Sequence, residues 1–380
     1  MKIDKAAIAG TLESSDCMVT VEPGNGSVEL ELESVVMNQF GEQIQKVVRE
    51  TLERLDVKDV FISIVDKGAL DCTIKARVEC AVNPNKKRLG RTMMFLNAQK
   101  PGLIKDPYIY KPDSIMLDLE DAVAEKEKDA ARFSLYHALR EINYRGIECI
   151  VRINGLDSEL WKEDIRCAVA GGADGIRITK TETAEDVRRV EKAVEEAENE
   201  FGIERVKVLI MAALESAKGV LNALDICNAS ERLFGIALSG GDYTKDLQTR
   251  ITGTGVELMG ARQHMIIAAR AAGVQCFDTV YTDLDDMEGF KKDVETIHLM
   301  GFDGKSIINP RQIAPVHEIY TPTQKEIVFS QKVVKEIEEK KKLGIGVFTV
   351  DGKMIDIAFY DGAKRTIELA KASGVLKEEF

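Results

Sequence analysis

The sequence predicts an α/β protein: a (β/α)8 TIM barrel with a C-terminal helical extension, preceded by a small α+β domain. From Thr92 onward, about eight short apolar runs alternate with helical stretches, as they do in a barrel of parallel strands. The first 80 residues do not share this alternation. A length of 380 residues exceeds one average domain and fits a barrel joined to a smaller module.

The predicted barrel strands are apolar runs of the kind that parallel sheets bury on both faces. In chain order they are Thr92–Asn97, Ser114–Asp121, Cys149–Asn154, Gly175–Lys180, Val206–Glu215, Leu233–Asp242, Val274–Thr282 and Gly304–Asn309. Thr183–Glu200 is acidic and amphipathic, which is typical of a helix on the outside of a barrel. After Pro310 the pattern predicts one long helix, a hairpin around Asp351-Gly352 and a final helix, so the extension begins at about residue 311.

The first 80 residues predict a ββαββ order. Met18–Glu33 alternates polar and apolar residues around Pro23–Gly26, which favours a hairpin, and a helical spacing follows from Val36 to Leu55. Val60–Val65 and Cys72–Val78 are predicted as two further strands. The stretch from 83 to 88 is polar and aperiodic and contains a proline, so we expect a linker over residues 81–90 between domains 1–80 and 91–380.

Composition excludes several classes of function. The net charge of -12 and the lack of a long basic block argue against a nucleic-acid partner. No apolar run approaches the ~20 residues of a membrane helix, and the N-terminus has no apolar signal core. The 7 cysteines are scattered without a C-x-x-C pair, as in a reduced cytoplasmic protein. The 4 histidines lack an H-x-x-x-H spacing, which argues against zinc.

Two neighbouring strands each end in an acid, Glu215 and Asp242. Parallel α/β folds place their chemistry at the C-terminal ends of the strands, so these carboxylates are expected to lie side by side. With no cysteine or histidine beside them, they suit a hard divalent cation with oxygen ligands, most simply Mg²⁺. The alternative is that both acids only cap the helices that follow.

Other strand ends carry charges too. Asp118 and Glu120 share one face of the second strand, and Asp121 lies on the other side or in the loop. The remaining polar strand ends are Arg152 and Asn154, Arg177 and Lys180, and Asp278. Clustered acids are unfavourable without a cation, and a cation would leave an arginine available for a substrate carboxylate or enolate oxygen. Alternatively, Arg177 and Lys180 simply pair with neighbouring acids, and Asp278 is an ordinary rim residue.

Several motifs resemble the citrate lyase family. Ala9–Asp16 (AGTLESSD) and Asp66–Asp71 (DKGALD) resemble its acyl carrier (gamma) subunit. The rest resembles the beta subunit, the citryl-thioester lyase of the HpcH/HpaI aldolase and citrate lyase family. The motifs are Leu117–Asp121, Val151–Asn154, Ala213–Ser216, Ala229–Leu233, Phe277–Tyr281, Phe302–Ser306 and Ile308–Gln312. From the residues alone, the serines of the first motif could be no more than exposed loop residues.

The resemblance implies roles for individual residues. Ser14 would carry a phosphoribosyl-dephospho-CoA prosthetic group through a phosphodiester, and the thiol of that group would carry the acyl chain. Glu215 and Asp242 would hold Mg²⁺, Glu120 and Asp121 would support its water ligands, and Arg152 would face the substrate oxygens. The residues expected to bind the thioester carrier are Arg91, Asn154, Lys180, Gly304, Lys305, Asn309 and Pro310. The chain departs from the family pattern at Phe95–Ala98, Thr179 and Gly241, which bears on the carrier-binding loop and one charge near the metal.

The activity implied is cleavage of a citryl thioester to oxaloacetate and an acetyl thioester. Asp118, Asp121 or a metal-bound hydroxide would take the hydroxyl proton. The expected partners are a CoA-transferase (alpha) subunit and further copies of the chain, in the cytoplasm. Two alternatives stay open: a lyase acting on free CoA thioesters such as malyl-CoA, which leaves residues 1–80 unexplained, and an acyl-carrying scaffold with an idle barrel.

Overall fold

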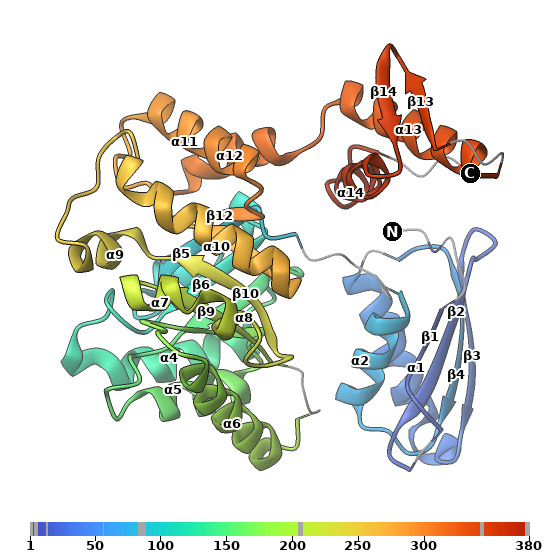
Figure 1. Cartoon of the computed structure of the whole chain (residues 1–380). Coiled ribbons are helices and arrows are strands. Elements are labelled where there is room, and N and C mark those ends of the chain that lie inside the picture. Colours follow the sequence, from blue (N-terminus) through green and yellow to red (C-terminus); the bar gives the residue numbers. More distant parts are fainter. Residues whose placement is uncertain are drawn as a thin grey trace. The chain divides into compact units, whose positions relative to one another are not determined.

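A computed structural model describes residues 3, 7–12, 14–55, 57–82, 89–203, 208–342 and 346–376. The chain divides into two compact units, Met1–Arg88 and Leu89–Phe380, each with its own apolar core (Figure 1). Helix α2 (Asp71–Val82) extends into the predicted linker 81–90. Residues 83–88 of that linker lie outside the described residues.

The first unit packs two helices, α1 (Met37–Arg54) and α2, on a four-stranded sheet. Its strands are β1 (Ala7–Ala9), β2 (Cys17–Glu22), β3 (Val28–Ser34) and β4 (Val60–Asp66), in the order β1-β2-β4-β3. Alternate residues of β2 and β4 are buried, as expected for a sheet with one covered face. The predicted α+β class is therefore confirmed for this unit.

Two details of this unit differ from the prediction. The expected hairpin over Met18–Glu33 is wrong, because β4 lies between β2 and β3, antiparallel to the first and parallel to the second. Gly24 passes so close to the start of β4 that a Cβ there would lie 2.4 Å from the Val60 nitrogen. The expected strand Cys72–Val78 is helix α2, because Ile74, Val78 and Ala81 are buried at helical spacing.

The second unit contains a closed barrel of eight parallel strands, as predicted (Figure 1). They are β5 (Thr92–Asn97), β6 (Ser114–Asp118), β7 (Glu148–Arg152), β8 (Gly175–Ile178), β9 (Leu209–Leu214), β10 (Leu233–Leu238), β11 (Gln275–Asp278) and β12 (Gly304–Ile307). β12 closes the barrel on β5. Several strands end before the predicted acids, so Glu120, Glu215 and Asp242 lie just beyond the strands.

Helices surround these strands. The longer ones are α4 (Lys128–Glu141), α5 (Trp161–Gly171), α6 (Ala184–Phe201), α10 (Met259–Ala272) and α11 (Met287–Met300), and α6 is the predicted acidic outer helix. The shorter ones are α3 (Pro101–Ile104), α7 (Ala217–Leu221), α8 (Ala223–Cys227) and α9 (Gly240–Asp246). Inside the barrel, Met93, Met116, Ile150, Met211 and Phe277 form a buried apolar layer. This layer supports the polar residues at the strand ends.

The C-terminal extension contains two helices where one was expected. α12 (Ile313–Tyr320) ends before Pro322, and α13 (Gln324–Lys342) begins behind a cap in which Thr323 and Glu326 exchange hydrogen bonds. The hairpin predicted at Asp351-Gly352 is confirmed as β13 (Val347–Val350) and β14 (Lys353–Asp356), and both turn residues have positive φ. Helix α14 (Phe359–Ala372) follows.

The seven cysteines are free, and Cys17, Cys149, Cys227 and Cys276 are buried. Burial is the main cause that raises the pKa of Cys17 to about 12, so its thiol stays protonated. No helix among the described residues is both long and apolar enough to span a membrane.

Candidate active site

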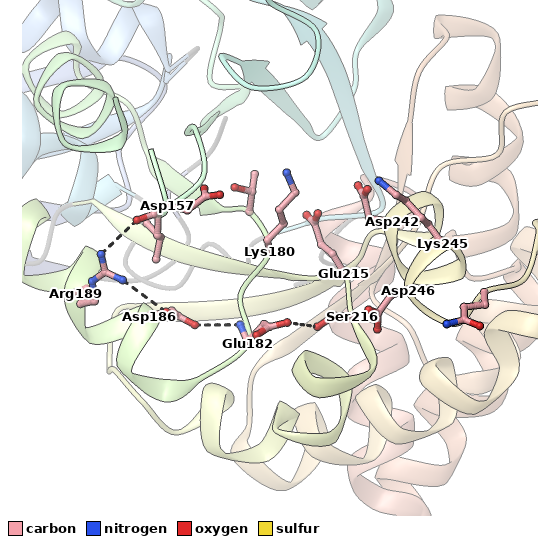
Figure 2. A pocket seen from close by; sticks show the side chains of 13 residues that line it. Asp157, Lys180, Glu182, Asp186, Arg189, Glu215, Ser216, Asp242, Lys245 and Asp246 are labelled. Carbon is pink, nitrogen blue, oxygen red and sulfur yellow. Dashed lines mark hydrogen bonds and ion pairs between the residues drawn. The ribbon is translucent and has the colours of Figure 1, made fainter. Parts of the chain in front are cut away.

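A cavity of about 710 Å³ lies at the C-terminal ends of β8, β9 and β10. Its walls include Thr179 and Lys180 after β8, Glu215 and Ser216 after β9, and Asp242 in α9. Figure 2 shows the Lys180, Glu215 and Asp242 side chains around one part of this cavity. The predicted edge of the barrel therefore carries the predicted acids.

A second cavity, of about 450 Å³, shares Asp242 with the first. It is lined by the charged residues Asp118, Asp121, Arg152 and Arg177, and by Phe95, Ser239 and Ser306. The two cavities together bring the acids of β6, β9 and β10 to one end of the barrel. A substrate that bridges them would meet both carboxylates and guanidinium groups.

Glu215 and Asp242 are suited to a cation. Glu215 is 4% exposed, and one of its oxygens accepts a hydrogen bond from Ser239 Oγ at 3.0 Å. Burial first, and then the negative charge of Asp242, raise the pKa of Glu215 although the Arg177 charge lowers it. A divalent ion between the two carboxylates would remove this unfavourable interaction. Within the described ranges no three histidine, cysteine or acidic side chains cluster for a metal, so such an ion would retain water or substrate ligands, as Mg²⁺ does.

Arg152 is bound to three carboxylates at the end of β7. Its Nε and Nη2 donate to the two oxygens of Asp118 at 2.7 and 2.6 Å, and Nη1 lies 2.9 Å from Glu120 and 3.5 Å from Asp121. Asp118 also accepts the Glu120 backbone N–H at 2.9 Å. Both Asp118 oxygens are thus engaged, whereas the Asp121 side chain is 62% exposed and lines the second cavity. Of the two carboxylates expected to accept a proton, Asp121 is the more available.

Glu120 is a buried acid between two cations. Burial raises its pKa to about 7, against the opposing charges of Arg152 and Lys180. Lys180 Nζ lies 3.0 Å from Glu120, so Lys180 does pair with a neighbouring acid, as the alternative interpretation expected. Lys180 also lines the first cavity. The backbone of Lys180 is in the left-handed region at φ 48°, a conformation that residues other than glycine, asparagine and aspartate rarely adopt.

The structure does not support the alternative that Arg177 simply pairs with a neighbouring acid. It is 2% exposed, lines the second cavity and forms no ion pair among the described residues. Its hydrogen bonds go to Ser239 Oγ at 3.1 Å and, weakly, to Met211 Sδ at 4.0 Å. Burial first, and then the charge of Arg152, lower the pKa of Arg177 to about 10. The alternation of β8, which buries Ile176 and Ile178 in the outer core, was the sequence signal that would have placed Arg177 inside the barrel.

Several residues predicted to bind the carrier lie away from both cavities. Arg91 precedes the first residue of β5, at the opposite end of the barrel, where it binds Asp113 in two hydrogen bonds of 2.8 Å. Lys305 is fully buried, and its Nζ binds Asp278 and Asp293 at 2.6 and 2.7 Å. These ion pairs between barrel and helices are structural, and they make Asp278 an internal residue rather than one at the rim.

The other carrier-binding predictions fall on structural positions as well. Asn154 is buried and donates to Asp164 of α5 at 2.6 Å. Gly304 approaches the backbone of Gly90 so closely that a Cβ would lie 1.8 Å from its carbonyl oxygen. Asn309 accepts the Arg311 backbone N–H at 3.0 Å, and Pro310 begins the short 3-10 helix Pro310–Gln312. Of the seven residues in this group, the structure brings Lys180 to a cavity.

In the first unit, Ser14 is exposed in a turn between β1 and β2. Asp16 holds this loop in place, since its carboxylate accepts hydrogen bonds from Thr11 at 2.8 and 3.2 Å and from Arg77 of α2 at 3.0 and 3.1 Å. Ser15, the neighbouring serine, has φ 66°, and its backbone N–H donates to Lys67. The Ser14 hydroxyl is therefore exposed between Thr11 and Asp16, which hydrogen-bond to each other.

Comparison with known proteins separates the same two units. A family model described as malonate decarboxylase delta subunit (MdcD), an acyl carrier type, matches residues 4–84, and the HpcH/HpaI aldolase/citrate lyase model matches residues 91–310. Citrate lyase subunit beta of Leuconostoc mesenteroides subsp. cremoris is 48% identical over 295 residues, covering 78% of this chain and 98% of the relative. A (3S)-malyl-CoA thioesterase of Cereibacter sphaeroides is 32% identical over 282 residues, 74% of this chain and 95% of that protein.

Among solved structures, the citrate lyase beta subunit of M. tuberculosis complexed with oxaloacetate and magnesium is 26% identical, with a TM-score of 0.52. The match covers 63% of this chain and all of that one (100%). The family model spans more than half of the chain, and the relatives agree with it. The chain therefore belongs to the HpcH/HpaI aldolase/citrate lyase family, as a lyase with an acyl-carrier-type domain at its N-terminus.

Proposed function

We propose that this chain is a fused carrier and lyase of citrate cleavage, in which the barrel splits a citryl thioester into oxaloacetate and an acetyl thioester. The observation that carries the proposal is the presence, in one chain, of an exposed Ser14 on a carrier-type unit and of the Glu215/Asp242 cavity in a citrate-lyase-type barrel. The presence of both units in one chain supports a reaction in which the barrel acts on an acyl group that the carrier-type unit holds.

Mg²⁺ is the metal proposed for Glu215 and Asp242. Two buried or partly buried carboxylates with mutual repulsion fit a hard cation, and the M. tuberculosis relative is described as a complex with magnesium and oxaloacetate. When bound, the ion would supply Lewis acidity toward the hydroxyl and carboxylate oxygens of the substrate. Glu120, held by Lys180 and Arg152, would support its water ligands.

The remaining chemistry falls to residues of the chain. Asp121 accepts the proton of the substrate hydroxyl, and the bond between the hydroxyl-bearing carbon and the carbon next to the thioester breaks. The electron pair of that bond passes to the thioester side as an enolate, which takes up a proton to give the acetyl thioester. The other product is the ketone of oxaloacetate. Arg152, fixed by its two bonds to Asp118, keeps Asp121 in place and stabilises negative charge at the cavity wall.

Ser14 is proposed as the attachment site of phosphoribosyl-dephospho-CoA. Attachment of a long phosphopantetheine arm needs an exposed hydroxyl in a surface loop, and Ser14 is exposed in the turn between β1 and β2. We also propose that the chain works in the cytoplasm, with a CoA-transferase subunit and further copies of itself, because its relative is a subunit of citrate lyase.

The second candidate is a lyase of free malyl-CoA-type thioesters. The 32% identity to a (3S)-malyl-CoA thioesterase favours a free malyl-CoA-type thioester as the substrate, whereas the carrier-type match over residues 4–84 has no role in this candidate. Intact-mass measurement of protein from its native host distinguishes the two. A mass increase equal to the prosthetic group, together with turnover of citryl groups loaded on that arm, is the expected result. Unmodified protein that cleaves only free CoA thioesters would establish the second candidate.

A further inference from the structure

Among the described residues of the barrel unit, three arginines are each only 2% exposed: Arg177, Arg232 and Arg262. Arg232 binds both oxygens of Glu198 at 2.9 and 2.7 Å, and Arg262 binds Asp278 and Asp293 at 2.8 to 2.9 Å. Arg177 has no such carboxylate among the described residues, and its buried Nε has no hydrogen-bond partner there. Burying an unpaired guanidinium is strongly unfavourable, so a missing anion is the simplest compensation.

The surroundings of Arg177 indicate where that anion would bind. Arg177 lines the second cavity, and so does Ser306, whose buried hydroxyl also has no partner within the described part of the chain. The ring of Phe95 lies 5.2 Å from the guanidinium carbon of Arg177 and adds an apolar wall. A guanidinium fork with a free hydroxyl nearby, shielded by an aromatic ring, suits a carboxylate.

The position of Arg177 also indicates which carboxylate. Ser239 Oγ bridges Arg177 at 3.1 Å and Glu215 at 3.0 Å, so Arg177 lies one hydroxyl group away from the proposed metal ligand. The hydroxyl-bearing carbon of a citryl thioester carries one carboxylate directly and a second one through a CH2 group. The first would accompany the hydroxyl at the metal, which leaves the second for a neighbouring cation. A malyl thioester lacks the second carboxylate.

We infer that Arg177, assisted by Ser306, binds the carboxymethyl carboxylate of the substrate and so selects citryl over malyl thioesters. This inference rests on the proposed function. It assigns to Arg177 a contact with a part of the substrate that does not react, and therefore predicts a change in discrimination more than a general loss of activity.

The test is Arg177→Met in the full chain with its prosthetic group, with Arg232→Met as a matched control for the loss of a buried arginine. Binding of oxaloacetate and of pyruvate, which lacks the second carboxylate, is measured by calorimetry in the presence of Mg²⁺. Arg177→Met should weaken oxaloacetate about 100-fold, the effect of losing hydrogen bonds to a charged group, and leave pyruvate unchanged. The ratio of kcat/KM for citryl over malyl thioester should fall similarly.

Stability provides a second readout. Arg177→Met removes a buried charge that forms no ion pair among the described residues, so its Tm should equal or exceed that of the unchanged protein. Arg232→Met removes the two hydrogen bonds that Arg232 donates to the buried Glu198, so its Tm should fall by roughly 5–10 °C while its substrate preference is kept. An Arg177→Met protein that unfolds or melts early would overturn the inference, because it would show that Arg177 is already compensated in the fold.

The outcomes separate the inference from the proposed function. If the unchanged chain does not cleave citryl thioester, the proposed function fails before any variant is compared. If it does cleave citryl thioester, and Arg177→Met weakens oxaloacetate and pyruvate equally, the inference fails alone. Arg177→Lys keeps a charge without the planar fork, and an oxaloacetate affinity between those of the Met variant and the unchanged protein would support the carboxylate contact.

Discussion

At the scale of single residues, the site is built from charges that differ in how they are compensated. Arg152 is surrounded by Asp118, Glu120 and Asp121, whereas Glu215 faces Asp242 across a cavity and is unfavourably charged. Charged side chains with an ion-pair partner, such as Arg152, fix the geometry of the site. We propose that those without one among the described residues, such as Glu215, bind a ligand. The two kinds should respond differently to substitution.

Glu215→Gln and Asp242→Asn should each abolish most of the cleavage rate, because each removes one of the two protein carboxylates proposed for Mg²⁺. EDTA should reproduce the loss, and added Mg²⁺ should reverse it in the unchanged protein. The measurement is cleavage rate against free Mg²⁺ concentration. Full activity in excess EDTA would contradict the metal assignment.

Arg152→Lys should be nearly as damaging as Arg152→Ala. A lysine cannot make the two bonds to Asp118 at 2.7 and 2.6 Å and contact Asp121 as well. We expect a loss of about 2–4 kcal/mol in transition-state stabilisation, as for other donors at developing negative charge. The cleavage rates and melting temperatures of both variants distinguish a catalytic role of Arg152 from a purely structural one. An active Lys variant with a normal Tm would show that Arg152 only neutralises its neighbours.

The strand ends could be predicted from the sequence, since an acid that follows a buried apolar run points to the barrel edge whatever its neighbours are. Glu215 and Asp242 were placed at the barrel edge in this way, and both line the first cavity. The lack of an ion pair at Arg177 within the described part of the chain could not be predicted, because the sequence does not say which charged side chains lie close together in three dimensions. The ion pairs of Arg91 and Lys305 could not be predicted for the same reason, because their carboxylate partners come from distant segments.

At the scale of elements, the loop that presents Ser14 depends on Asp16. Although burial raises it, hydrogen bonds from Arg77 and Thr11 lower the pKa of Asp16 to about 2. Because the pKa of Asp16 is lowered by folding, its carboxylate stabilises the loop fully at pH values above the usual pKa of 3.8. This stabilisation is lost as the pH falls through about 2. Hydrogen exchange of the Cys17 amide, which donates to Asp16 at 2.8 Å, should accelerate over this range. In Asp16→Asn the amide should already exchange fast near neutral pH, and a slow amide there would contradict this role.

Ser14→Ala should abolish prosthetic-group attachment and leave Tm unchanged, because the serine is exposed in a turn and supports nothing in the core. Ser15→Ala is the matched control and should keep the added mass. Intact-mass spectrometry of protein made together with its attachment enzymes checks both. A modified Ser14→Ala protein would move the site to another residue.

The positions of the barrel strands were predicted well, and the pairing of the strands in the first unit was not. All eight barrel strands were found, because their burial on both faces leaves unbroken apolar runs. The order β2-β4-β3 could not be predicted, because alternation identifies a strand without identifying its partner. Helix α2 was mistaken for a strand because its isoleucine and valines favour strands locally, and packing overrides this preference.

At the scale of the whole molecule, the carrier-type and barrel units share one chain. A short tether raises the effective concentration of the carrier at its enzyme, to roughly millimolar. Cutting the chain at an inserted protease site within residues 83–88 should therefore lower the cleavage rate in dilute solution. The rate should return as free carrier unit is added toward about millimolar concentration. An unchanged rate after cutting would show that the join contributes nothing to delivery.

The buried cysteines described above have a consequence for the cargo. An acyl thioester is exposed to capture by any nearby thiolate, which would transfer the acyl group to the protein and stop the cycle. Cys17 lies three positions after Ser14, but burial raises its pKa to about 12, and burial likewise keeps the thiols of Cys149 and Cys276 protonated. Burial thus keeps these three thiols from competing with the pantetheine sulfur, whereas Cys72 and Cys80 of α2 are exposed.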